Sequence, residues 1–288
     1  MQMNKNTKLI LAIAGVILCI SLVSGGLILL LESKEKWPSD DIYVYDSNGY
    51  MLYEAGEDIA IDILLCALHR NGKNPMKKYQ NVFFETNNGI RYQADLTSDI
   101  ISSLFNENEI ISESVVRFRL NGGFVAGDTL NFKKLVLQKV DGTEIVRDFG
   151  NIVIEIIQRS EIKDKIEIEI PSVYSAKLDE FSYTIKNKMK TDIIVQELYL
   201  GEGINYESVP VSVMGSETKE IKVDFSGTEE FNDLPNYVVI KPGFKILAEQ
   251  GREYVCSAIG MTAYSANITN EQLRVYLLDY VNKDKIED

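Results

Sequence analysis

The order of apolar and polar residues changes character once along the chain, near residue 36. Residues 9–31 read LILAIAGVILCISLVSGGLILLL, with no charged side chain and only two serines as polar ones. A helix rises about 1.5 Å per residue, so a run of this length crosses the roughly 30 Å hydrocarbon core of a bilayer. The pattern therefore predicts a transmembrane helix over residues 9–31.

The same run has a competing interpretation as a cleaved signal peptide. The apolar core of a signal peptide is usually about 7–15 residues long and ends at a cleavage site of small residues. Ser24 and Gly26 offer such a site, but a further apolar stretch, residues 27–31, follows them directly. We expect an uncleaved anchor, with cleavage after Ser24 or Gly26 as the alternative.

Charges beside the run predict its orientation. Lys5, Lys8 and the terminal amine precede it without any acid, whereas acids and bases cancel over residues 32–36. Positively charged flanks tend to stay in the cytoplasm. We therefore expect residues 1–8 in the cytoplasm and the bulk of the chain outside it, in a single-pass protein of the cell membrane. Trp37 then lies at the membrane interface, or packs on the first strand.

Beyond Pro38 the chain alternates apolar and polar residues in short stretches separated by turn residues, which predicts antiparallel strands. The dipeptides Asn48-Gly49, Asn88-Gly89 and Asp141-Gly142 each lie between two such stretches. Both central residues of the tightest hairpin turn need positive φ, which Asn-Gly and Asp-Gly tolerate. The sequence therefore predicts three β-hairpins at these dipeptides.

One segment within this region has helical spacing instead. Thr97 to Asp99 offer capping side chains, and Ile100, Ile101, Leu104 and Phe105 would share one face of a helix. We expect a short helix here, crossing between strands.

The expected fold is mainly β, with an N-terminal transmembrane helix followed by two tandem β-sandwich domains of immunoglobulin-like type. The charged stretch 158–165 suggests the boundary, so the first domain would span 37–160 and the second 165–281, with a polar tail over 282–288. Residues 270–281 fit either a closing strand or a helix. The pattern lacks the alternating strands and long helices of dinucleotide-binding domains.

Charge narrows the range of partners. The chain carries 43 acidic and 30 basic residues, a net charge of −13, and residues 37–288 alone carry −15. Nucleic-acid binding needs lysine and arginine to replace the counterions of phosphates. We therefore expect no nucleic-acid partner. The excess of acidic residues lies in the part of the chain that we expect outside the cytoplasm.

Residue types needed for common catalytic sites are scarce. His69 is the only histidine, so a metal site with two histidines is impossible and any Ser-His-Asp triad would have to use it. Cys66 and Cys256 fall in different expected domains, and the sequence leaves open whether they are oxidised. Acidic residues are abundant, so paired-carboxylate glycan hydrolysis stays an alternative. We expect no catalytic site, no metal and no cofactor.

Three glycine-containing loops carry the candidate contact residues, because the loops of a sandwich commonly carry recognition. These candidates are Phe124, Val125, Ile204, Tyr206 and Tyr264.

The function we expect is that of a membrane-anchored, extracytoplasmic, non-catalytic binding or scaffolding protein of a bacterial cell envelope, with a protein or cell-wall partner. One alternative is a small envelope glycan hydrolase that uses carboxylates. Another is an accessory subunit of a multi-span membrane complex, packed through the small residues around Gly25 and Gly26.

Overall fold

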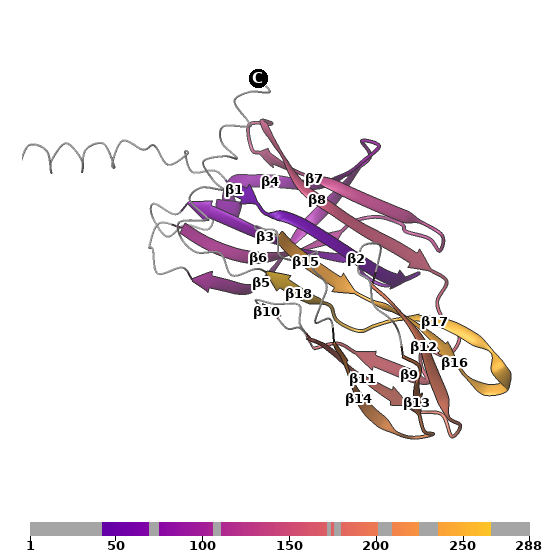
Figure 1. Cartoon of the computed structure of the whole chain (residues 1–288). Coiled ribbons are helices and arrows are strands. Elements are labelled where there is room, and N and C mark those ends of the chain that lie inside the picture. The colour runs from indigo at the N-terminus through magenta and orange to yellow at the C-terminus, as the bar shows by residue number, and fades with distance from the viewer. Residues whose placement is uncertain are drawn as a thin grey trace, which may run out of the picture. The chain divides into compact units, whose positions relative to one another are not determined.

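The computed structural model describes residues 42–68, 75–105, 111–171, 174–175, 180–200, 209–224 and 236–265 (Figure 1). The expected transmembrane segment 9–31, Trp37, His69, Ile204, Tyr206 and the segment 270–281 lie outside these residues. Within the described part, no helix is long and apolar enough to cross a membrane. The internal contacts of the chain group Asp40–Tyr280 into one compact unit.

The described part is built from strands, which confirms the prediction of a mainly β fold. The first half contains β1 (Ile42–Val44), β2 (Asp46–Glu54), β3 (Ala60–Leu68), β4 (Tyr79–Thr86), β5 (Arg91–Phe105), β6 (Ile111–Leu120), β7 (Thr129–Lys139) and β8 (Glu144–Ile157). A short 3-10 helix, η1 (Pro75–Lys78), precedes β4.

The second half continues the same architecture. Its elements are β9 (Ile166–Glu169), β10 (Tyr174–Ser175), β11 (Glu180–Asn187), β12 (Ile193–Tyr199), β13 (Val211–Val213), β14 (Thr218–Asp224), β15 (Asn236–Lys241), β16 (Gly243–Leu247), η3 (Glu249–Gly251), β17 (Glu253–Ser257) and β18 (Thr262–Ser265).

The largest sheet joins strands from both halves. Its order is β1-β3-β6-β5-β4-β7-β8-β2-β15-β18-β10, with β2 parallel to both β8 and β15. The guanidinium Nε of Arg147 on β8 donates to the carbonyl of Ile42 on β1 at 3.3 Å. Because these strands lie six places apart in the order, the sheet must curl back on itself.

Aromatic side chains fill the inside of this curled sheet. The ring of Phe84 meets Phe118, Phe132 and Phe149 edge-on, with centroids 5.4, 5.7 and 5.7 Å away. All four rings are fully buried. Edge-to-face contacts of this kind add to the stabilisation from burial alone.

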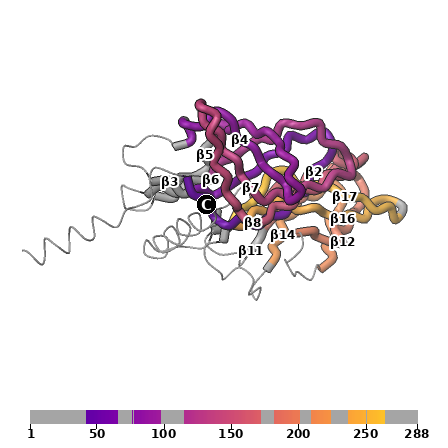
Figure 2. Tube along the Cα trace, turned by 90° about the horizontal axis from the view of Figure 1, so that it is seen from above, coloured from indigo at the N-terminus to yellow at the C-terminus, as the bar shows by residue number. Residues whose placement is uncertain are grey.

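The remaining strands of the second half form two smaller sheets, β14-β11-β9 and β13-β12-β16-β17. One apolar cluster contains residues of both, including Ile185 of β11 and Ile246 of β16, each fully buried. Two sheets that share one core pack face to face as a sandwich. In both views β17 lies beside β2 of the first half (Figures 1 and 2). A Cβ added at Gly243, the first residue of β16, would overlap Leu52.

Two of the three predicted hairpins are confirmed. Gly89 in the β4–β5 turn and Gly142 in the β7–β8 turn have φ of 80° and 85°. The third was wrong, since Asn48-Gly49 lies inside β2. A Cβ at Gly49 would come within 2.6 Å of Val239 Cγ1 on β15. The glycine there permits close approach of a neighbouring strand and not a turn.

The helix predicted over 97–105 was also wrong. Strand β5 continues to Phe105 and pairs with β6, and its register shifts between Leu96 and Ile100 and again between Ile100 and Ser102. Extra residues at β-bulges interrupt the two-residue period of a strand. Apolar residues on either side of such bulges can therefore be three or four positions apart in the sequence, which is also the spacing along one face of a helix.

The division of the chain into domains at 37–160 and 165–281 stays a prediction. Residues 158–165 do connect β8 to β9. However, β15 and β18 of the second half pair into the sheet of the first half, six residue pairs joining β15 to β2. The two halves therefore share backbone hydrogen bonds as well as a connecting segment.

Candidate functional site

The turn between β2 and β3 places two carboxylates side by side. The Glu54 N–H donates to Glu57 Oε2 at 3.0 Å, and the Glu57 N–H donates to the Glu54 carbonyl at 3.0 Å. Gly56 adopts a φ of 89°, which lets the chain reverse within these few residues. Both carboxylates thus lie at the end of the first half that meets the second.

These carboxylates are neutralised by two lysines, Lys163 of the segment that connects β8 to β9 and Lys241 of β15. Lys163 Nζ lies 3.2 Å from Glu54 Oε1 and also pairs with Glu57. Lys241 Nζ lies 3.3 Å from Glu57 Oε2 and donates to the Leu52 carbonyl at 2.9 Å. The Glu54 and Lys241 side chains are 1% and 6% exposed. We call Glu54, Glu57, Lys163 and Lys241 the ion cluster, and its net charge is zero.

Ser257 at the end of β17 completes the hydrogen bonding of the ion cluster. Its hydroxyl accepts from Lys163 Nζ at 3.1 Å and donates to the Glu57 carboxylate, whose oxygens lie 3.1 and 3.2 Å away. Buried charges are tolerated when each is paired and its remaining hydrogen-bonding capacity is used. The cluster meets both conditions.

Burial and pairing shift the acid–base properties of the cluster in defined directions. Desolvation lowers the pKa of Lys241 to about 8, although the charge of Glu57 opposes the shift. The Lys241 ammonium also lies 4.4 Å from the centroid of the Tyr53 ring. Burial alone would raise the pKa of Glu57, but Lys241 and Lys163 outweigh it and hold that pKa below 4.5. Glu57 is therefore ionised at neutral pH.

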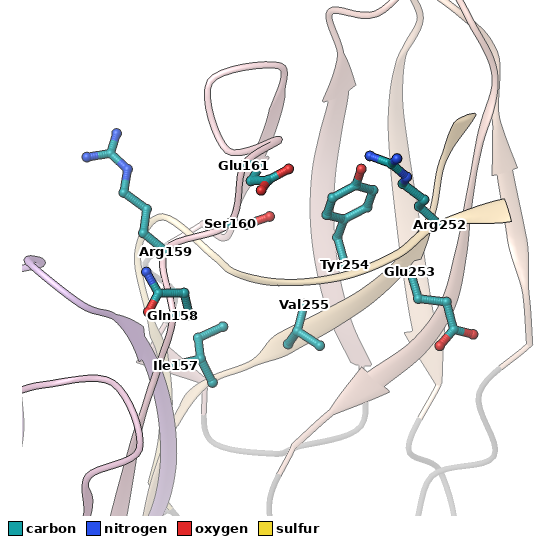
Figure 3. A pocket seen from close by; sticks show the side chains of 9 residues that line it. All are labelled: Ile157, Gln158, Arg159, Ser160, Glu161, Arg252, Glu253, Tyr254 and Val255. Carbon is teal, nitrogen blue, oxygen red and sulfur yellow. The ribbon is translucent and has the colours of Figure 1, made fainter. Parts of the chain in front are cut away.

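An open groove lies next to the ion cluster (Figure 3). One wall is the segment after β8 and the other is β17, and the groove encloses about 540 Å³. Its lining residues are Ile157, Gln158, Arg159, Ser160, Glu161, Arg252, Glu253, Tyr254 and Val255.

The carboxylate of Glu54 hydrogen-bonds to both walls of this groove. Its Oε2 accepts from the Ser160 N–H at 3.4 Å, and its Oε1 accepts from the Ser257 N–H at 3.2 Å. A third link joins the walls directly, from the Cys256 thiol to Ser160 Oγ at 3.4 Å. The ion cluster thus fixes the spacing between the walls.

The three predicted contact residues that the structure describes, Phe124, Val125 and Tyr264, are not among the residues that line the groove. Phe124 packs its ring on Tyr92, with centroids 5.7 Å apart, and Val125 beside it is 60% exposed. Tyr264 lies in β18, paired with Val238, and not in a loop as predicted. Trp37, Ile204 and Tyr206 fall outside the described residues.

The groove and the ion cluster were missed because their residues are far apart in the sequence. One local signal existed, since Lys241 ends the otherwise apolar run Tyr237-Val-Val-Ile240. A charged residue in such a run indicates a buried partner of opposite charge.

The described part of the chain contains two cysteines, Cys66 and Cys256. Cys256 is a free, buried thiol, and burial raises its pKa to about 11. Cys66 lies in β3, opposite Tyr43 of β1. Across the residues described above, no group of three or more His, Cys, Asp or Glu side chains is placed to hold a metal ion.

Comparisons with known proteins give only distant similarities. No protein-family model matches the chain. No curated protein sequence matches it either.

Several solved structures are similar over most of the chain. The fibronectin(III)-like modules of Clostridium thermocellum CbhA are 10% identical, with 79% of this chain and 94% of that one covered and a TM-score of 0.21. A Porphyromonas gingivalis W83 protein of unknown function is 8% identical, with 78% and 99% covered and a TM-score of 0.22. The periplasmic chaperone SfaE is 12% identical, with 76% and 100% covered and a TM-score of 0.20. Scores this low establish neither a shared fold nor a shared activity.

Proposed function

We propose that the chain is a membrane-anchored, extracytoplasmic binding or scaffolding protein of a bacterial cell envelope, which binds its partner in the groove beside the ion cluster. The observation that carries this proposal is the bridging of both groove walls by Glu54. Burying charges such as those of Glu54 and Lys241 is costly unless their geometry is well satisfied. Here the buried charges hold an open surface in one shape, as a binding site requires.

The state of the carboxylates favours binding over glycan hydrolysis. A glycosidase needs one carboxyl group whose pKa is raised, so that it can donate a proton to the leaving group. Lys241 and Lys163 instead lower the pKa of Glu57. Glu54 is buried and pairs with Lys163. These carboxylates are suited to hold structure together.

The proposal also includes the anchor and the division into domains. Residues 9–31 would span the membrane with residues 1–8 in the cytoplasm, and two immunoglobulin-like sandwiches would follow over 37–160 and 165–281. The support for the second sandwich is the core shared by its two smaller sheets.

Cysteine labelling in intact cells tests the location. Val140 is 79% exposed at the β7–β8 turn, so Val140→Cys should react with a membrane-impermeant maleimide added to intact cells. Asn4→Cys should react only after the membrane is permeabilised. The parent chain, with its own three cysteines, gives the background. The reverse pattern, or no membrane association at all, would refute the anchored topology.

A second experiment separates the binding function from its alternatives. The full chain should release no reducing ends from purified cell-wall glycan, and hydrolysis that disappears in Glu57→Gln would establish the hydrolase instead. Replacing Gly25 and Gly26 by Leu should leave membrane insertion and groove binding unchanged. Loss of a co-purifying multi-span protein on that change would favour the accessory subunit.

A further inference from the structure

We infer that the groove binds an extended peptide segment of a partner protein, which adds to β17 as a further strand of the sheet β13-β12-β16-β17. The inference rests on the proposed function and names the chemistry of its partner. In this mode of recognition, backbone hydrogen bonds supply the affinity and alternate side chains supply the specificity.

The backbone N–H and C=O groups of even-numbered residues in and beside β17 point toward β16. Those of odd-numbered residues point toward the groove. The Arg252 carbonyl accepts from the Ala248 N–H at 2.9 Å, and the Ala258 N–H donates to the Pro242 carbonyl at 3.4 Å, so both positions face β16. The Ser257 N–H instead donates to Glu54, on the opposite edge. Since backbone groups alternate between the two edges of a strand, the backbone groups of Glu253 and Val255 face outward.

The outer edge of β17 is occupied at one end and open at the other. Ile259, just beyond the strand, exchanges hydrogen bonds with Ile168 and Ile170 at the end of β9. Ser257 is paired with the ion cluster. Within the described part of the chain, nothing pairs with the outward N–H and C=O groups of Glu253 and Val255. Both residues line the groove, and Val255 is 37% exposed.

An open strand edge recognises one kind of ligand chemistry, a second extended backbone. The volume of about 540 Å³ lies within the range of about 300–1,000 Å³ common for ligand sites. Because Glu54 already fixes both walls, little ordering of the protein is needed when the peptide enters. The site is preorganised for a short strand.

The charges of the groove favour a peptide over an anionic wall polymer. Glu253 pairs with Lys245 at 3.1 Å, and Arg159 pairs with Asp164 at 3.4 Å. Arg252 and Glu161 have no ion-pair partner among the described residues. One unpaired charge of each sign complements a segment that carries both an acidic and a basic side chain. A polymer of uniform negative charge would be repelled by Glu161 and by the acidic chain as a whole.

Selection from a phage-displayed random octapeptide library tests the inference. The target is the full chain in detergent micelles, with Val255→Pro used for counter-selection. Proline removes the outward N–H of residue 255 but none of the bonds to β16, and edge strands tolerate proline in that orientation. We expect enriched clones whose synthetic peptides bind Val255→Pro at least roughly tenfold more weakly than the parent.

Two further measurements identify the mode of binding. Val255→Thr keeps the N–H in a side chain of similar size and should bind peptides like the parent, so it is the matched control. N-methylation of a peptide residue whose N–H faces β17 should weaken binding by roughly tenfold. N-methylation of the residues between, whose N–H groups face away from β17, should leave binding unchanged. If Val255→Pro fails to fold, Arg252→Glu should still shift the enriched clones from acidic to basic residues.

Each of the following outcomes except the last overturns the inference. No enriched clone, or clones that bind Val255→Pro as tightly as the parent, would remove the peptide site. Binding of N-acetylglucosamine oligomers in place of peptides would leave the proposed function standing and assign the groove to glycan. Self-association of the parent that Val255→Pro abolishes would assign the edge to a second copy of the chain. If the chain binds peptides but cysteine labelling places residues 37–288 in the cytoplasm, only the proposed extracytoplasmic location is refuted.

Discussion

At the scale of single residues, Lys241 is the cation whose removal should cost most. Lys241→Met keeps the length of the side chain but leaves the partly buried Glu57, 26% exposed, with Lys163 as its cation. Breaking a buried ion pair by removing one partner costs about 3–5 kcal/mol. We expect a loss of this size in the free energy of unfolding by urea.

Lys245 provides the control for this substitution. It lies on β16 and pairs with Glu253, a carboxylate that is 52% exposed. Exposed ion pairs are screened by water and contribute little, so Lys245→Met should change stability little. Similar losses in the two variants would mean that the ion cluster is not a buried network in solution.

The lowered pKa of Lys241 predicts how its contribution depends on pH. The unfolded chain keeps this proton up to about pH 10.5, whereas the folded protein releases it near pH 8. Between these values the unfolded state holds more protons, so stability rises with pH. The unfolding free energy of the parent minus that of Lys241→Met should therefore increase from pH 8 to 10.5. A flat or falling difference would contradict the shift.

At the scale of elements, the parallel pairing of β2 with β15 depends on Gly49. An added Cβ would come within 2.6 Å of Val239 Cγ1 and 2.7 Å of the Val239 carbonyl oxygen. Gly49→Val should therefore separate the strands, with a cost of about 1–3 kcal/mol or more. Hydrogen exchange measured by mass spectrometry should show faster exchange of the β15 amides. Gly123→Ala, where an added Cβ meets no atom within 4 Å, should leave both stability and exchange unchanged.

The strand elements also show which parts of the fold local sequence can predict. Asn88-Gly89 and Asp141-Gly142 form the predicted turns because their neighbours pair with each other. Asn48-Gly49 has the same chemistry, yet β2 pairs with β8 and β15, which lie about one hundred and two hundred residues further on. The turn propensity of a dipeptide does not reveal whether strands far away in the sequence will pair with the same residues. The bulges of β5 were missed for a related reason, since they follow from its register with β6.

The residues of the candidate site were harder to predict from the sequence than the strands were. Glu54 and Glu57 stand in a short Glu-Ala-Gly-Glu turn, which reads as a solvated loop. Only the fold brings them to Lys163, Ser257 and Lys241, at separations of more than one hundred residues. The alternation of apolar and polar residues predicted the fold class most reliably, because that pattern depends on many residues at once.

At the scale of the whole molecule, the shared sheet and the ion cluster predict that the two halves unfold together. Strand β2 obtains one of its two neighbours, β15, from the second half. Glu57 obtains one of its cations, Lys241, from the second half and the other, Lys163, from the connecting segment. Cooperative contacts of this extent favour a single transition. In the full chain, amides of β8 and of β11 should lose protection at the same urea concentration.

A fragment ending after β8 provides the complementary measurement. In residues 40–160, the edge of β2 would be unpaired, and the buried Glu54 and the partly buried Glu57 would lack their lysines. Exposed edges promote association, so we expect this fragment to unfold at lower urea than the first half does within the chain, or to aggregate. Two separate transitions in the full chain, together with an isolated fragment as stable as the first half in context, would show that the halves are independent domains joined only by residues 158–165.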